Sequence, residues 1–310
     1  MKKRSEFSFF MFRVKKQIGW NVDMVQAIQN HNISIAVLDT GISKHPDLRD
    51  AVFDFKDFVH GKVGGYDDCG HGTHVSGILC GSGEISDGRY CGMAPGMKLV
   101  VGKVLDEKGD GNVETMVAGM EWIIKNKDKY GIRILNVSIG TGSYIDVNKE
   151  EILKDMLISA WKKGLVVVCA AGNSGPKADT VSSIGRSPYL LTVGCHDGEY
   201  YADKANRCSS YSGRGALFDT VRKPDIVAPG TEIISCNYKY EWGKKGYVAK
   251  SGTSMATPII AGAMGLLLAK HPEFDNETAK RKILYTAKNL NIPWNEQGWG
   301  MVDMTKMMKD

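Results

Sequence analysis

The sequence predicts a three-layer α/β fold, in which a mainly parallel, twisted sheet carries helices on both faces. Short runs rich in Val, Ile and Leu alternate along the chain with longer segments of helical periodicity. These runs are continuously apolar, as expected for strands that helices cover on both sides. At 310 residues, the chain can bury a large core within one such domain.

The expected elements follow one another in a regular order. Strands are expected at 33–38, 99–105, 134–138, 165–169, 190–193 and 225–228. Helical patterns occupy 74–79, 116–125, 150–163 and 259–270. Sites in open parallel sheets form beyond the carboxyl ends of the strands, so residues directly after these strands are the first functional candidates.

Charge and hydropathy exclude several classes of partner. The 40 basic and 35 acidic residues are interspersed and give a net charge of only +5, so we expect no nucleic-acid partner. The longest apolar stretch, 255–269, contains Pro258 and two glycines and is too short for a membrane span. It predicts a buried core helix and no membrane partner, whereas the oligomeric state is left open.

The seven cysteines are an odd number without a C-x-x-C pair or compact spacing. This pattern predicts neither a disulfide framework nor a zinc cage. It favours reduced thiols and a cytoplasmic location. The apolar patch near the amino terminus is shorter than the apolar region of a secretory signal and lacks a small-residue cleavage site, so no signal peptide is expected.

Three distant segments carry the residue types of nucleophilic catalysis. Ser254 lies where a tight turn gives way to an apolar helical pattern, which exposes its hydroxyl and leaves its N–H unpaired. Asp39 ends an expected strand in Asp39-Thr40-Gly41, and His71 opens a helix. A serine hydroxyl is a weak nucleophile at neutral pH and needs a base with an orienting group behind it. We therefore predict His71 as the base and Asp39 as its carboxylate.

In the order Asp, His, Ser, these segments resemble the motifs of the subtilisin-like serine peptidases, the subtilases. The resemblance runs from about Gly19 to Asp303 and implies a subtilisin-like fold and an endopeptidase that forms an acyl-enzyme. The segment 170–175 also resembles the family's oxyanion-hole segment. This implies that the Asn173 amide and the Ser254 N–H donate together to the developing oxyanion.

The resemblance also implies how the substrate is bound. Two extended segments, Gly109-Asp110-Gly111 and Ser138-Ile139-Gly140, would pair with the substrate backbone. The pocket for the residue before the cut would be lined by uncharged residues, which favours a neutral or apolar side chain there. These residues are Ser138, Ile139, Gly140, Gly172, Ser174 and Ser182.

The next pockets would be flanked by Cys69 and Leu105, with Val113 and Met116 further out. Four acidic residues form the rim of this region: Asp106, Glu107, Asp110 and Glu114. Either they favour basic substrate residues upstream of the cut, or they belong to an ordinary solvated loop.

The resemblance divides the chain into a catalytic domain at 19–310 and an amino-terminal extension at 1–18. Residues 1–16 of this extension form either a regulatory tail across the cleft or a disordered segment. Catalysis needs no cofactor in this family. Asp47 matches one calcium ligand of the family, which suggests a structural calcium ion, although the composition of 81–91 differs from the usual calcium loop.

Other functions fit the sequence less well. Asp-Thr-Gly also occurs in aspartic peptidases, but the second triplet or the small β-rich dimer that they require is not apparent. His71 and His74 lack the glutamate of an H-E-x-x-H zinc motif, so His74 is interpreted as a structural helix residue. A catalytically silent, subtilase-like peptide-binding module stays open as the alternative, although it would have no use for all four catalytic residues.

Overall fold

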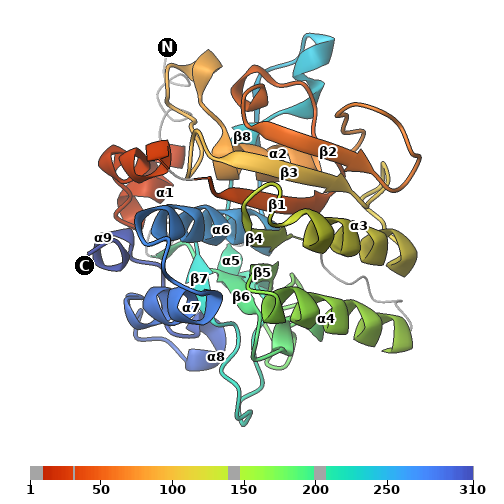
Figure 1. Cartoon of the computed structure of the whole chain (residues 1–310). Coiled ribbons are helices and arrows are strands. Elements are labelled where there is room, and N and C mark those ends of the chain that lie inside the picture. Colours follow the sequence, from red (N-terminus) through yellow and green to blue (C-terminus); the bar gives the residue numbers. More distant parts are fainter. Residues whose placement is uncertain (1–9, 31, 139–146, 199–206, 310) are drawn as a thin grey trace.

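Seven parallel strands form the central sheet of a computed structural model, which describes residues 10–30, 32–138, 147–198 and 207–309 (Figure 1). Their order is β2-β3-β1-β4-β5-β6-β7. Each of the six neighbouring pairs is parallel. The strands are β1 (Ser34–Asp39), β2 (Val52–Asp57), β3 (Lys98–Lys103), β4 (Ile132–Val137), β5 (Val166–Ala170), β6 (Leu191–Cys195) and β7 (Ile226–Ala228).

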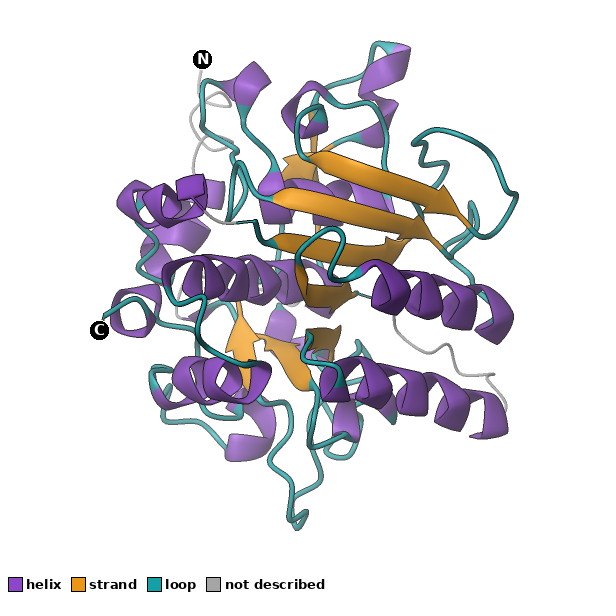
Figure 2. Ribbon diagram, in the orientation of Figure 1, coloured by secondary structure: helices purple, strands orange, loops and turns teal. Residues whose placement is uncertain are grey.

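Helices cover both faces of this sheet, which confirms the predicted α/β fold (Figure 2). One face packs against α1 (Phe10–Gln17), α2 (His71–Cys80), α6 (Thr253–Lys270) and α7 (Asn276–Tyr285). The other face packs against α3 (Val113–Asn126) and α4 (Val147–Lys162). Short helices complete the framework: α5 (Cys208–Tyr211), α8 (Trp294–Gln297), α9 (Met304–Met307), and the 3-10 turns η1 (Val22–Asn30), η2 (Pro46–Leu48), η3 (Glu84–Ser86), η4 (Ile184–Arg186) and η6 (Tyr238–Trp242).

Strand β1 shows why these apolar runs form a two-faced sheet. Successive strand side chains point to opposite faces. Ile35 and Val37 accordingly enter the core with α2 and α6, whereas Ala36 and Leu38 enter the core with α3 and α4. Every residue of β1 is buried. Because β1 lies between β3 and β4, its carboxyl end is the point where the sheet connections diverge, and Asp39 is the last residue there.

Helix α6 runs through the core, as the sequence predicts. It is long and apolar enough to cross a membrane, but 89% of its residues are buried inside the fold. A helix that is apolar on all sides is typical of a protein interior. Its first turn carries Ser254, so the core holds the position of this serine.

A second sheet was not predicted. It is antiparallel and pairs β8 (Ile233–Cys236) with β9 (Tyr247–Lys250). His74 on α2 is fully buried against it, with Nε2 3.0 Å from the Ile233 carbonyl oxygen and 3.1 Å from that of Val248. Burial lowers the pKa of His74 to about 3. His74 is therefore the neutral, structural histidine that the sequence predicts.

The described part of the amino-terminal extension belongs to the main core. Met11, Val14 and Ile18 are buried in the core that contains α6. Arg13 donates to the Thr231 carbonyl oxygen at 3.0 Å. In Figure 1, α1 lies at the opposite end of the strands from their arrowheads, hence away from Asp39. Residues 10–16 therefore form neither of the two expected alternatives, a tail across the cleft or a disordered segment, while residues 1–9 lie outside the described residues.

Candidate active site

Strand β1 and helix α2 bring Asp39 and His71 into direct contact. His71 Nδ1 lies 2.7 Å from Asp39 Oδ1 and 2.9 Å from Oδ2. The Asp39 side chain is fully buried, while 25% of the His71 side chain is exposed. Burial opposes protonation of His71, but the charge and hydrogen bond of Asp39 outweigh it and raise the pKa of the imidazole. The contact occupies Nδ1 and leaves Nε2 for a second partner.

Asp67 holds the start of α2 in place. Its buried carboxylate accepts five hydrogen bonds, at 2.6 to 3.1 Å. The donors are Thr40 Oγ1, Cys69 N, Gly70 N, Thr73 N and Thr73 Oγ1. Because Thr40 follows Asp39 and the other donors surround His71, one carboxylate ties the two segments together. No motif in the sequence marks Asp67, so its positioning role becomes apparent only from these contacts.

Two further features fix the ends of the strands. Gly72 packs so closely on β1 that a side chain there would collide with the Gly41 carbonyl oxygen and crowd the Asp39 side chain. The fully buried Lys103 donates to the carbonyl oxygens of Thr40 and Leu105, both at 2.8 Å. It also forms an ion pair with the Asp68 carboxylate. A buried lysine needs such partners. The sequence does not predict this role of Lys103, because nothing distinguishes it from the other residues of its strand.

The first turn of α6 gathers Ser254 and Asn173. Asn173 Oδ1 accepts hydrogen bonds from Thr253 N at 3.0 Å and from Thr253 Oγ1 at 3.1 Å, so it caps the helix in place of Gly252. A methyl group added to Gly252 would lie 3.5 Å from Asn173 Nδ2 and 3.8 Å from Ser254 N. Both N–H donors therefore border one small space beside the serine.

The Ser254 hydroxyl has a different partner from the predicted one. Among the described residues it donates to the Ser138 carbonyl oxygen at 2.9 Å, and not to His71. The chain just before Ser254 nevertheless reaches the histidine segment, because Lys250 Nζ donates to the Gly70 carbonyl oxygen at 3.1 Å. Catalytic hydrogen bonds often form only when substrate is bound, so the pairing of Ser254 with His71 is a prediction for the substrate complex.

The comparisons with known proteins decide the family. A family model described as the subtilase family matches residues 30–300. The chain belongs to this family. Over 286 residues it is 37% identical to serine protease AprX of Bacillus subtilis (strain 168). This match covers 88% of the chain and 64% of the length of AprX. By family, the chain is thus a subtilisin-like serine protease.

Other relatives match over nearly their full length. The subtilase described here is 34% identical over 295 residues to Subtilisin Savinase of Lederbergia lenta, which covers 93% of this chain and 97% of Savinase. Among solved structures, Sphericase superposes with a TM-score of 0.75 at 27% identity, covering 90% of this chain and 96% of Sphericase. These matches confirm the predicted subtilisin-like fold.

The structure places several of the expected substrate-binding residues near the site. Ser138 follows β4 and contacts Ser254, whereas Ile139 and Gly140 lie outside the described residues. Gly172 and Ser174 flank Asn173 directly after β5. The segment of Ser182 joins them, since its N–H donates to the carbonyl oxygen of Ala171 at 3.1 Å.

The second expected segment forms the loop between β3 and α3. It contains Gly109, Asp110 and Gly111, and a methyl group at Gly109 would lie 3.8 Å from Cys69 Sγ. The three apolar residues expected around the outer pockets are buried: Leu105, Val113 and Met116. In the rim, the Asp106 carboxylate accepts the N–H groups of Lys108 and Asp110, both at 2.9 Å.

Cys69 lies two residues before His71 and is half-buried. Burial raises the pKa of its thiol, with the neighbouring Asp67 and Asp39 charges acting in the same direction. The reactive form of cysteine is the thiolate. We therefore expect little reactivity from Cys69 at neutral pH.

The surroundings of Asp47 do not fit calcium. Asp47 Oδ1 accepts from Ile85 N at 3.2 Å, and Oδ2 accepts from the Tyr247 hydroxyl at 2.7 Å. Among the His, Cys, Asp and Glu side chains of the described residues, Asp47 is grouped with His45 and Cys236. Calcium prefers six to eight oxygen ligands, whereas nitrogen and sulfur suit softer metals. Both carboxylate oxygens instead hold the chain around η3 and β9.

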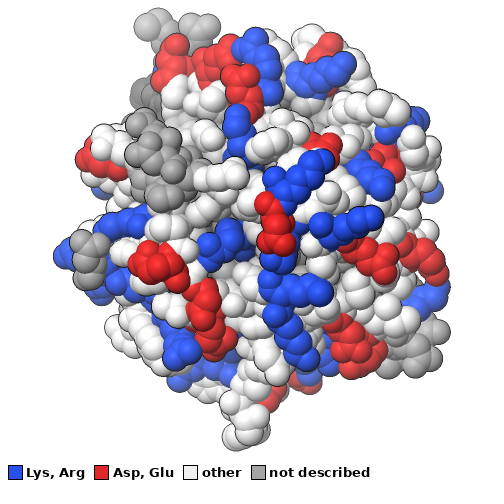
Figure 3. Space-filling view, viewed as in Figure 1, with Lys and Arg blue, Asp and Glu red and all other residues white. Residues whose placement is uncertain are grey.

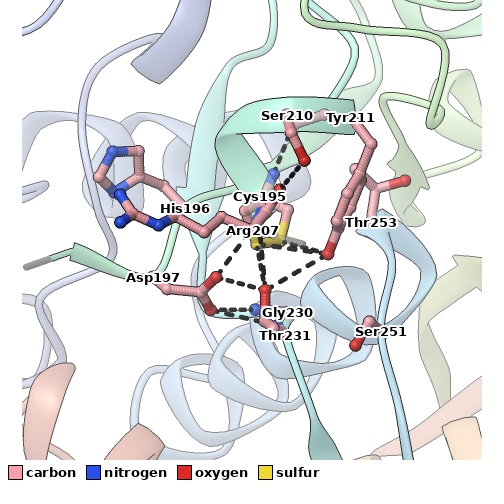
Figure 4. Close-up of a disulfide and its surroundings, with 12 residues drawn as sticks. Cys195, His196, Asp197, Arg207, Ser210, Tyr211, Gly230, Thr231, Ser251 and Thr253 are labelled. Atoms are coloured by element: carbon pink, nitrogen blue, oxygen red, sulfur yellow. Dashed lines mark hydrogen bonds between the residues drawn. A yellow bond between two sulfur atoms is a disulfide. The ribbon is translucent and has the colours of Figure 1, made fainter. Parts of the chain in front are cut away.

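The structure corrects the expectation that the cysteines are unpaired. Cys195 at the end of β6 and Cys208 at the start of α5 form a disulfide between residues 13 apart in sequence (Figure 4). The five other cysteines are free. A single pair with irregular spacing leaves no pattern in the sequence, because the fold and not the local chain brings the two sulfur atoms together.

The surface charge agrees with the sequence. On the face shown in Figure 3, basic and acidic side chains are intermingled across the whole view.

Proposed function

We propose that this subtilase is a serine endopeptidase that works through an acyl-enzyme formed on Ser254. The observation that supports it most directly is the buried Asp39 carboxylate on His71 Nδ1, at 2.7 and 2.9 Å. This contact selects the tautomer in which Nε2 is an acceptor. An imidazole in this form can take a proton from a hydroxyl and return it to a leaving amine.

The reaction begins when the Ser254 hydroxyl turns from the Ser138 carbonyl toward His71 Nε2. His71 takes the hydroxyl proton as the oxygen attacks the substrate carbonyl carbon. It then gives this proton to the departing amine, which leaves the acyl group on Ser254. Water, activated by His71 in the same way, releases the acid and restores the serine. Asp39 stabilises the imidazolium and stays ionised.

Asn173 and the Ser254 N–H stabilise the oxyanion in this scheme. Their donor groups border one space beside the first turn of α6. The hydrogen bonds between Asn173 Oδ1 and Thr253 fix the amide orientation before substrate arrives. Such preorganised donors act most strongly where charge develops. This arrangement also argues against a silent peptide-binding module.

Labelling with a fluorophosphonate probe tests the proposal. The probe reacts with activated serines, so it should label the wild-type protein, and Ser254→Ala should abolish labelling. Ser251→Ala, three residues earlier in the same turn, is the matched control and should be labelled normally. If the wild-type protein binds peptides but is neither labelled nor cleaves them, the peptide-binding module is the correct function.

We further propose that the residue before the cut is neutral or apolar. Gly172, Ser174 and Ser182 contribute no charge to this pocket. The acidic loop around Asp106 would favour basic residues further upstream, and salt should weaken that preference. Cleavage of a peptide library measures both, and a strict requirement for Arg or Lys before the cut would contradict the pocket assignment.

A further inference from the structure

The disulfide is separated from the turn before Ser254 by a single residue, Gly230. Cys195 ends β6, and its sulfur faces Gly230, as Figure 4 shows. A methyl group added to Gly230 would lie 2.5 Å from Cys195 Sγ and 2.7 Å from the Gly252 carbonyl oxygen. Gly230 is thus held between the disulfide and the serine turn. The Gly252 N–H also donates to the Gly230 carbonyl oxygen at 3.0 Å.

The other half of the disulfide reaches the Asn173 loop. Cys208 begins α5, which ends at Tyr211. The Tyr211 carbonyl oxygen accepts the Gly175 N–H at 2.9 Å, and the Gly213 N–H donates to the Gly172 carbonyl oxygen at 2.8 Å. The two cysteines therefore stand behind the two segments that supply the oxyanion donors.

The surroundings of the sulfur atoms suit both oxidation states. The Tyr211 hydroxyl lies 3.5 Å from Cys195 Sγ and 3.7 Å from Cys208 Sγ, and Thr231 Oγ1 lies 3.5 Å from Cys208 Sγ. These oxygens can accept hydrogen bonds from thiols. Asp197 in turn holds Gly230 and Thr231 through their N–H groups, at 3.2 and 3.1 Å. Thr231, whose hydroxyl lies beside the sulfur atoms, is therefore held together with Gly230 by Asp197.

We propose that Cys195 and Cys208 form a redox modification site whose state controls the geometry of the oxyanion donors. A disulfide holds two sulfur atoms about 2 Å apart, whereas unbonded atoms of this size need roughly 3.5 Å or more. Both side chains are almost fully buried, at 2% and 1% exposure. The additional space on reduction must therefore come from the neighbours of the pair. On one side that neighbour is Gly230, which in turn contacts Gly252.

The oxidation is a thiol–disulfide exchange with a small-molecule disulfide as the oxidant. One cysteine thiolate attacks this disulfide and releases one small thiol, which leaves a mixed disulfide on the protein. The second cysteine attacks the protein sulfur of the mixed disulfide and releases the second small thiol. Two electrons pass to the oxidant, and the two cysteine protons end on the two released thiols.

Redox titration of peptidase activity tests the proposal, and this arm rests on the proposed function. The protein is equilibrated with mixtures of 2-mercaptoethanol and its linear disulfide. We expect kcat/KM to fall at least fivefold on reduction and to recover on reoxidation. Cys195→Ser/Cys208→Ser should stay at the low value in all mixtures, while Cys80→Ala, which removes a free cysteine, should respond as the wild-type protein does.

Amide hydrogen exchange gives a readout that does not depend on activity. In a Ser254→Ala background, reduction should speed exchange of the Gly252 N–H, which bonds to Gly230. Unchanged exchange and unchanged kcat/KM, with reduction of the pair verified by mass spectrometry, would overturn the proposal. So would one tightly bound divalent metal per reduced chain, because Cys195, Asp197 and Cys208 would then be a metal site. Loss of Ser254-dependent labelling with a normal exchange response would overturn the proposed function alone.

Discussion

Removal of the Asp67 carboxylate should destabilise the protein far more than removal of an ordinary helix cap. Asp67 is only 6% exposed and accepts five hydrogen bonds. A buried donor without a partner costs about 1–3 kcal/mol. Water entering the vacated space restores some of these bonds, so we expect Asp67→Ala to cost about 4 kcal/mol, similar to breaking a buried charged network.

Asn112→Ala is the matched control. Asn112 caps α3 through one hydrogen bond to Thr115 N at 2.7 Å, so its loss should cost about 1 kcal/mol. Both variants are made in a Ser254→Ala background, which prevents self-digestion. At about 2–3 °C per kcal/mol, thermal unfolding should show a fall of roughly 10 °C in Tm for Asp67→Ala and roughly 3 °C for Asn112→Ala.

The reasoning also makes a catalytic prediction. Asp67 holds the backbone on both sides of His71. In an Asp67→Ala enzyme that keeps Ser254, the fold decrease in kcat should therefore exceed the fold increase in KM, even at temperatures well below the Tm. Equal Tm shifts in the two variants would refute the claim that this carboxylate organises the start of α2. A large Tm shift with normal kcat would restrict Asp67 to a purely structural role.

The remaining predictions concern the histidines and Asp39. Asp39→Asn should lower kcat on the order of 10⁴-fold with little change in KM, because the amide no longer selects the tautomer with a free Nε2; steady-state kinetics measure this. Activity needs neutral His71, whose pKa is raised, so kcat/KM should fall as the pH drops through a value above the usual one near 6.5. The Lys250 charge opposes protonation of His71, so Lys250→Met should move this acid limb to still higher pH, whereas Lys250→Arg should leave it in place. The pKa of His74 is about 3 when folded and near 6.5 when unfolded, so the unfolded state binds the extra proton. Relative to His74→Gln, in the Ser254→Ala background, the protein should therefore lose stability as the pH falls from 6.5 to 3, on the order of 4 kcal/mol in all, as urea unfolding at each pH would show.

The sequence predicts the buried half of the sheet well, because continuous apolar runs leave few alternatives. It misses β2, whose residues Val52 to Asp57 mix apolar and charged side chains and, except for Asp57, are half-buried or exposed. An edge strand of this kind carries too few buried residues to stand out. The antiparallel pair β8 and β9 is also missed. Strand β9 is mostly half-exposed, and β8, although buried, is a run of only four residues without a second apolar run beside it in the sequence.

The site is predictable where chemistry requires a residue type and hidden where the fold alone creates the contact. Asp39, His71, Asn173 and Ser254 lie in short motifs that can be read locally. Asp67 resembles any loop aspartate until Thr40, 27 residues away, is placed beside it. The pairing of Cys195 with Cys208 likewise becomes apparent only when β6 and α5 are neighbours.

A peptidase can cleave other copies of itself. The position of α6 in the core affects how well the protein resists this self-digestion. Helix α6, whose first turn carries Ser254, is enclosed by the sheet and by α2. A cut in an exposed loop would leave this helix, β1 and α2 still packed together. We therefore expect molecules with one cleaved loop to remain active. The rate of inactivation by self-digestion should equal the rate of global unfolding.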